Sequence, residues 1–305
     1  MLPSTSAWDE LGLGFVGKTT VGEKGRLDYQ FYVLNGVALN TQLQAALQTQ
    51  ASNKDKLVTT VSLKPDTGTF ATDSKSDKAL TGRLAFIPVV GHELGGSFYW
   101  GRYTPQLMAD EKVWSVGLDG LTHLGPLELE GEYVFSRFAG LRTVAQSFAQ
   151  LAKNRAAGGT TAGVDTSLQF QLANLAGTKH GYWLEARYPF WPEVFNHTVL
   201  AQGFSDPRLI PILRWEQVWL PSLLKEANFA EGTLTEFATE SRFVNRVTAG
   251  LAYRPIPPVS FTLAYEFTWT NDGKSLVTVT NFLPAKATED HDHALLFGMV
   301  FGFSS

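Results

Sequence analysis

The sequence predicts an all-β fold, an antiparallel transmembrane β-barrel that forms a single domain over residues 1–305. Two observations predict it. Apolar and polar residues alternate with a period of two along many segments, which sorts side chains onto the two faces of a strand. The connections between these segments are short at one end and long at the other, which is typical of membrane barrels.

The alternation is clearest in the second half of the chain. In residues 127–135, Leu127, Leu129, Tyr133 and Phe135 alternate with Glu128, Glu130, Glu132 and Val134. Residues 261–269 repeat the pattern, and residues 295–303 place aromatic and aliphatic side chains on one face and small residues on the other. By the same rule we expect eleven strands, at roughly 10–20, 26–37, 81–90, 93–104, 113–123, 127–138, 181–190, 209–219, 246–254, 260–270 and 294–303.

The connections follow a rule of their own. Short turns are predicted at 22–25, 90–92, 125–126 and 255–258, and a longer connection at 191–208 falls on the same end. Long polar stretches are expected as loops at 38–80, 139–180, 220–245 and 271–293, with a medium one at 105–112. In outer-membrane barrels the short turns are periplasmic and the long loops extracellular.

The strand count has a consequence for the chain start. Bacterial barrels have an even number of strands, so eleven strands predict at least one more. We expect either that the chain is incomplete at its N-terminus, with about 12–16 strands in the complete protein, or that a strand was missed, for example at 57–63.

Composition excludes several classes. The chain has no cysteine, so it has neither disulfides nor a thiolate metal site. A formal charge of -4 argues against nucleic-acid binding. No run of apolar residues approaches the length of a spanning helix, and residues 1–8 do not resemble a signal peptide.

One strand face is expected to contact lipid and the other to line the barrel. The outward positions are apolar, as in Tyr29-Phe31-Val33, Leu84-Phe86 and Trp114-Val116-Leu118. The inward positions carry mixed charges and are the candidate pore-lining residues: Lys18, Arg26, Asp28, Arg83, Glu93, Asp119, Glu128, Glu130, Glu132, Glu185, Arg187, Arg214, Glu216, Arg246, Arg254 and Glu266. Because Glu128, Glu130 and Glu132 are a local concentration of one sign, they would weakly favour cations or neutral solutes; a merely solvated face is the alternative.

The 139–180 loop begins with a stretch, 144–152, that could form a short helix. Such a loop can fold into the lumen and narrow it, or lie on the extracellular rim. The sequence leaves both open.

The search for chemistry leads to no enzyme. None of the six histidines lies beside a serine in a nucleophile setting. His291 and His293 are the best metal-like pair, but a solvated turn before the last strand is the preferred interpretation. No catalytic residue, cofactor or metal is predicted.

Several strand motifs together resemble one family. They are the segment 27–36 (LDYQFYVLNG), the hairpin 82–98 with GRLAFIP and LGGSF, and GLD at 117–119 followed by GPLELEGEY at 125–133. Later strands with GYWLEA at 181–186 and LAYRP at 251–255 also match. From about residue 10 onward the chain is similar to the outer-membrane porins grouped with phosphate-selective porins O and P.

The resemblance implies a water-filled, trimeric barrel in the bacterial outer membrane, in contact with lipid and lipopolysaccharide and longer than this chain at its N-terminus. Phosphate is not carried over, because that preference depends on concentrated lumenal Arg and Lys, whereas the inward charges here are mixed. We expect passive diffusion of small hydrophilic solutes or ions with weak selectivity. The alternatives are a structural barrel with an occluded lumen that scaffolds an envelope assembly, a hydrolase at the rim, and a soluble sandwich.

Overall fold

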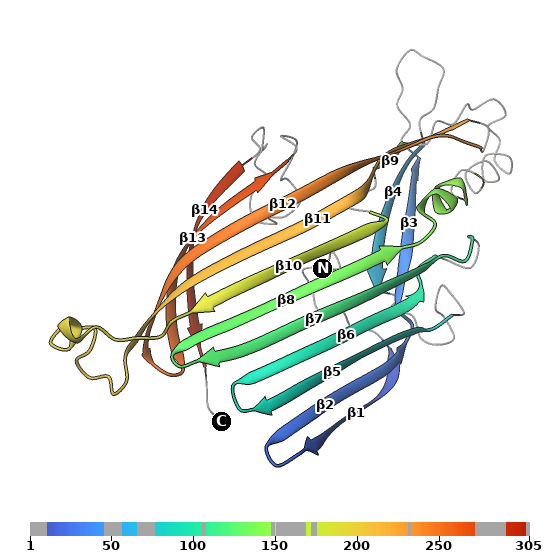
Figure 1. Ribbon diagram of the computed structural model, residues 1–305. Coiled ribbons are helices and arrows are strands. Elements are labelled where there is room, and N and C mark those ends of the chain that lie inside the picture. The colour runs from blue at the N-terminus through green and yellow to red at the C-terminus, as the bar shows by residue number, and fades with distance from the viewer. Residues whose placement is uncertain are drawn as a thin grey trace.

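The computed structural model describes residues 11–45, 57–65, 77–104, 108–147, 150, 169–171, 176–230, 233–271 and 291–302. Eleven strands in these ranges form one antiparallel meander, in the order β1-β2-β5-β6-β7-β8-β10-β11-β12-β13-β14 (Figure 1). Their bounds are β1 Gly12–Val21, β2 Gly25–Leu34, β5 Ala79–Val89, β6 His92–Arg102, β7 Lys112–Leu124, β8 Leu127–Phe138, β10 Thr178–Arg187, β11 Arg208–Ala230, β12 Thr233–Ile256, β13 Val259–Thr270 and β14 His291–Phe301.

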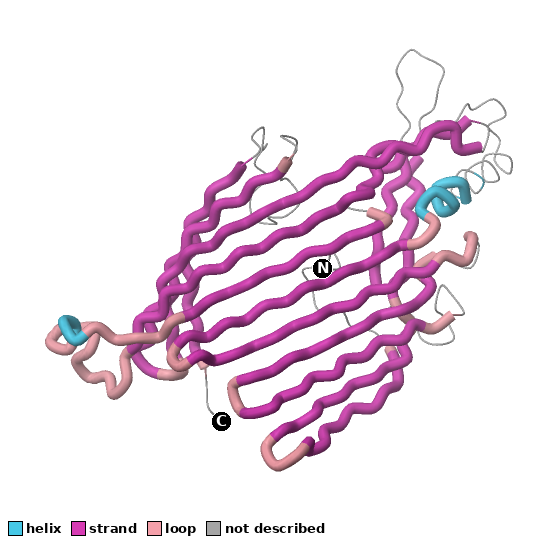
Figure 2. The backbone as a smooth tube through the Cα atoms, viewed as in Figure 1, coloured by secondary structure: helices cyan, strands magenta, loops and turns pink. Residues whose placement is uncertain are grey.

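The short turns are confirmed. Tight turns join β1 to β2, β5 to β6, β7 to β8 and β12 to β13, all at one end of the sheet, here called the short-turn end (Figure 2). Gly22, Gly91 and Gly125 have positive φ angles of 66°, 89° and 62°, a conformation that glycine adopts without steric cost. The opposite end is called the long-loop end.

The sheet is curled but open. The sequence predicts a closed barrel, whereas in the described residues β1 pairs only with β2, and β14 pairs only with β13. Both edge strands run toward the short-turn end, because neighbouring strands of the meander alternate in direction and the number of strands, eleven, is odd. Direct pairing of β1 with β14 would therefore be parallel, unlike every other ladder of this sheet.

A second, three-stranded sheet contains β3 (Val37–Ala45), β4 (Leu57–Pro65) and β9 (Gln169–Gln171). The expected loop at 38–80 therefore contains two strands. The candidate strand at 57–63 exists as β4, but it pairs with β3 and β9 rather than extending the main sheet. Figure 1 shows β3 and β4 at the long-loop end of the main sheet.

The predicted loop at 220–245 is wrong. β11 and β12 continue through it as one long hairpin and pair as far as Ala230 opposite Thr233. The register shifts between Leu220 and Leu223, between Leu224 and Glu226, and between Asn228 and Phe229. A one-residue irregularity moves the side chains that follow it to the other face of the sheet. The period-two pattern of the sequence is therefore interrupted although the strand continues.

Two other boundaries need correction. His291 and His293, expected in a polar loop, belong to β14. The expected helix at 144–152 is present in part, because residues 141–147 are helical within the predicted 139–180 loop. The expected end of the last strand at residue 303 lies outside the described residues.

Candidate functional site

The strand register places all sixteen predicted pore-lining residues on one face of the main sheet, here called the charged face. Directly opposed residues share a face, and the pairs Lys18–Asp28, Asp119–Glu132, Glu130–Glu185, Glu185–Arg214, Glu216–Arg246 and Thr248–Glu266 link the face from β1 to β13. These side chains form one continuous surface.

The first cluster on the charged face surrounds Arg83 of β5. Its Nη2 lies 2.7 Å from the Glu93 Oε1 atom and also contacts the Asp119 carboxylate, so one guanidinium joins β5, β6 and β7. Gly95 faces this cluster, and a Cβ at that position would collide with Asp119 and Arg83. Gly95 thus leaves the space that the ion pairs occupy.

A second cluster surrounds Arg187 of β10. Its Nη1 lies 2.7 Å from Glu128 Oε1 and 3.4 Å from Glu130 Oε2, while its Nη2 contacts the Glu185 carboxylate. Two of these acids belong to β8 and the third to β10. The guanidinium thereby holds three carboxylates that would otherwise repel one another.

Arg214 of β11 continues the network and introduces an aromatic residue. Its guanidinium lies 3.4 Å from Glu185 and 2.8 Å from Glu216, and its Cζ lies 4.3 Å from the centre of the Trp183 ring. The Trp183 indole N–H donates a hydrogen bond of 3.0 Å to Glu132. Within the part of the chain that the structure describes, Glu132 pairs with no Arg or Lys side chain.

The last cluster joins β11, β12 and β13. Arg246 Nη1 lies 3.8 Å from Glu216 and 4.0 Å from Glu266, and its Nε donates to Thr268 Oγ1 at 3.1 Å. Thr248 donates to Glu266 at 3.4 Å. The charged network therefore runs without a break across five neighbouring strands, from β8 to β13.

The remaining predicted residues lie nearer the edges and the rim. Lys18 is opposite Asp28, whose Oδ1 atom lies 2.8 Å from Arg26 Nε. Arg254 is opposite Arg208 at the short-turn end, where Arg208 pairs with Asp206 at 2.8 Å. The sixteen residues comprise seven cations and nine carboxylates, and the acidic surplus is concentrated on β8.

At the long-loop end, the charged face is covered by other parts of the chain. The backbone N–H of Val37, where β3 begins, donates a 2.8 Å hydrogen bond to the hydroxyl of Tyr99 on β6. Tyr103 is fully buried, donates to the Ala139 carbonyl at 2.6 Å and packs edge-on against Phe138 with ring centres 5.4 Å apart. Burial and the nearby Glu111 raise the pKa of Tyr103 above its ordinary range.

The helical residues 141–147 contribute to the same cover. Leu141, Val144 and Ala145 are buried, and the Gln146 side chain accepts a 2.7 Å hydrogen bond from the Leu234 backbone N–H of the long hairpin. The start of the 139–180 segment is thus fastened to the main sheet. We call the covering residues, Val37, Tyr103, Leu141, Val144 and Ala145, the cover.

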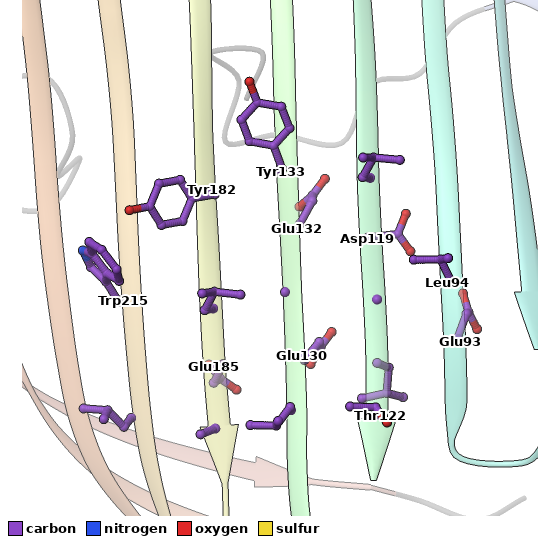
Figure 3. Close-up of a pocket in the computed structure, with 18 residues that line it drawn as sticks. Glu93, Leu94, Asp119, Thr122, Glu130, Glu132, Tyr133, Tyr182, Glu185 and Trp215 are labelled. Carbon is purple, nitrogen blue, oxygen red and sulfur yellow. The ribbon is translucent and has the colours of Figure 1, made fainter. Parts of the chain in front are cut away.

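The opposite face of the sheet, here called the apolar face, is exposed. The side chain of Leu13 is 74% exposed, that of Leu118 60%, that of Leu184 57% and that of Phe297 73%. A shallow hollow lies in this face where Leu94, Gly120, Gly131 and Leu184 are neighbours across β6, β7, β8 and β10 (Figure 3). In a sheet that folds in water, the apolar face is normally covered and the charged face exposed.

Two aromatic bands border the apolar face. At the long-loop end, Trp114 and Phe135 have ring centres 5.1 Å apart, and His180 and Trp219 4.7 Å apart. His291 and His293 lie in the same band, since the ring of His293 is 4.9 Å from that of Phe267. At the short-turn end the band includes Tyr188, Phe190, Trp191, Tyr253 and Phe261.

Sequence reasoning missed several residues of the charged face, among them Trp183 and Lys179. Both were detectable, since they lie two and six residues before Glu185 and so share its face. Lys179 is buried, with its Nζ 5.0 Å from the centre of the Phe138 ring. The cover could not be detected in this way, because it joins segments that are far apart in sequence.

The described residues contain no group of three or more His, Asp or Glu side chains arranged to hold a metal ion. No helix in the described part of the chain is long and apolar enough to cross a membrane. No family model and no curated protein matches the sequence.

Proposed function

We propose that the chain is an outer-membrane porin, a barrel whose charged face lines a water-filled path for small hydrophilic solutes or ions. The observation that carries the proposal is the polarity of the two faces: the apolar face is exposed and the ionic face is the more covered one. Lipid is the solvent in which such a face is stable, because it gains from contact with acyl chains and needs no protein partner.

The dimensions support this assignment. On β11, Trp219 and Leu209 are ten residues apart, and Leu209 forms a bridge with Phe190 of the second aromatic band. At ~3.3 Å per residue this is about 33 Å along the strand. A tilt of about 40° reduces it to about 25 Å along the membrane normal, the height of the apolar band of a membrane barrel.

A membrane location requires the open edges to be closed, because unpaired backbone groups in lipid cost several kcal/mol each. Since β1 and β14 run in the same direction, an all-antiparallel closure needs an odd number of further strands between them. We propose a closed barrel of twelve or more strands on this ground, whichever segment or chain supplies them. A homotrimer and the phosphate-porin resemblance remain proposals that the motifs in the sequence support.

The cover favours a second candidate, a structural barrel with an occluded lumen. Val37, Tyr103 and the helical residues 141–147 lie over the charged face, where a solute would enter from the long-loop end. An occluded barrel would not leak ions, so the two functions differ in conductance.

The experiment is single-channel recording of the folded, detergent-purified protein in a planar bilayer, with the reversal potential measured under a KCl gradient. Stable ohmic steps are the expected result. Folded, heat-modifiable protein that inserts but passes no current would contradict the porin function and favour the occluded barrel.

A further inference from the structure

The connection between β10 and β11 differs from every other connection at the short-turn end. The described turns there contain two or three residues, whereas residues 188–207 form a long loop with a short 3-10 helix, Glu193–Phe195. Figure 1 shows this loop projecting past the strand ends, at the opposite end of the molecule from β3 and β4. We call it the 188–207 loop.

The 188–207 loop has a defined conformation. Phe190 and Leu209 exchange backbone hydrogen bonds of 2.9 and 2.8 Å at its base. Within it, Phe195, Ala201, Gln202 and Phe204 each donate a backbone hydrogen bond to a carbonyl three or four residues earlier. Part of its backbone polar groups are therefore satisfied within the loop, which lowers the cost of moving those groups out of water.

The loop is attached to the apolar face rather than to the charged face. The ring of Trp191 lies 6.4 Å from the ring of Tyr253, an apolar-face residue of β12. The Tyr253 hydroxyl donates a 2.6 Å hydrogen bond to the carbonyl of Leu200. These contacts make the loop surface continuous with the short-turn aromatic band.

The loop exposes four apolar side chains next to polar ones such as Glu193, Asn196 and Gln202. Val194 is 75% exposed and Val199 80% exposed, and Leu200 and Phe204 are also exposed. The Trp191 indole N–H is satisfied by Asn196 at 2.9 Å. Aromatic rings with a satisfied polar group, next to exposed aliphatic side chains, are the composition of a segment that enters the lipid interface.

We propose that the 188–207 loop is a membrane-surface anchor, whose Val194 and Val199 side chains insert into the lipid leaflet at the short-turn end. The inference rests on the proposed membrane location and goes beyond it, because a transmembrane barrel needs no such loop. The loop would contact phospholipid at the boundary between headgroups and acyl chains. It would hold the short-turn rim at a fixed depth.

The experiment exploits the absence of cysteine, since any introduced cysteine is the single labelling site. Val194→Cys and Val199→Cys are labelled with an environment-sensitive fluorophore in the full-length protein reconstituted into phospholipid vesicles. Quenching is measured with lipids that carry a nitroxide near the headgroup or on the acyl chain and, separately, with aqueous iodide. Val90→Cys, in the 98% exposed position of the β5–β6 turn, is the matched control at the same rim, and Leu184→Cys reports on the apolar face.

The expected result is strong nitroxide quenching at positions 194 and 199, with iodide quenching about threefold or more below that at position 90. If Leu184→Cys is quenched by the nitroxide while positions 194 and 199 respond to iodide as position 90 does, the anchor is refuted and the membrane location stands. If positions 194 and 199 are shielded from both quenchers, they contact protein, and the anchor is again refuted. If Leu184→Cys is not quenched by lipid, the membrane location itself fails.

Discussion

The hydroxyl of Tyr99 accepts a 2.8 Å hydrogen bond from the backbone N–H of Val37, and this bond joins the main sheet to the start of the second one. Both residues are buried, so the bond fixes the cover over the charged face without help from water. A substitution at Tyr99 therefore tests the attachment of the second sheet without changing the backbone pairing of the main sheet.

Tyr99→Phe should loosen the cover while leaving the main sheet folded. The substitution removes the hydroxyl that accepts the hydrogen bond of the Val37 N–H, and loss of a typical hydrogen bond costs about 0.5–1.5 kcal/mol. We expect faster hydrogen exchange at the Val37 amide and larger current fluctuations. Tyr133→Phe, on the apolar face, is the matched control and should change neither. Unchanged exchange at Val37 in Tyr99→Phe would show that this bond does not hold the cover.

Glu132→Gln should reduce any preference of the path for cations. Glu132 is held by Trp183 and is paired with no Arg or Lys among the described residues, so its charge is the least neutralised of the β8 acids. One carboxylate of nine should change the cation-to-anion permeability ratio by less than about twofold. The reversal potential under a KCl gradient measures it. Glu193→Gln, in the 188–207 loop, removes the same charge away from the charged face; an equal shift there would contradict the assignment.

Arg83→Met should destabilise the sheet more than Arg83→Lys. Loss of the guanidinium leaves Glu93 and Asp119 facing each other without a cation, whereas lysine keeps the charge. The three groups are partly exposed, so screening limits the expected loss of unfolding free energy to about 1–2 kcal/mol. Denaturant titration followed by heat modifiability measures it. Equal stability of the two variants would mean that the charge of Arg83 contributes nothing.

The cover should weaken at high pH through Tyr103. Burial raises its pKa, so the neutral phenol is favoured in the folded protein. The stability that this contributes is complete below the pKa of the unfolded phenol, about 10, and is lost progressively as pH rises above that value toward the folded pKa. The protection factors of the amides around Ala139, which compare their exchange with the rate of an unfolded chain at the same pH, should therefore fall above about pH 10. Tyr103→Phe should remove this pH dependence; its persistence would assign the effect to another group.

The sequence predicts the eleven strands of the main sheet, their short turns and the charged face, because all of these follow from the period of two. Glu128, Glu130 and Glu132 reveal their common face without any knowledge of their partners. The ion pairs themselves depend on register, and register is set by turns and bulges that hydrophobic alternation does not encode. The continuation of β11 and β12 through residues 220–245 was missed for this reason.

The cover could not be predicted for a different reason. Val37, Tyr103 and Leu141 come from three connections, and each has an ordinary composition for a loop. Their burial arises from contacts over long sequence separations, as with Val37 and Tyr99, which are 62 residues apart. Local patterns carry no information about which loops meet.

The long hairpin makes the two sides of the sheet unequal in height. β11 continues eleven residues beyond Trp219 to Ala230, about 36 Å along the strand at ~3.3 Å per residue. The helical residues 141–147 are tied to it, through Gln146 and Leu234 and through Arg142, which lies 5.9 Å from the Phe237 ring. A protein that bound the hairpin would therefore also act on the cover, through these two contacts. Movement of the hairpin would thus be transmitted to the cover at the long-loop end.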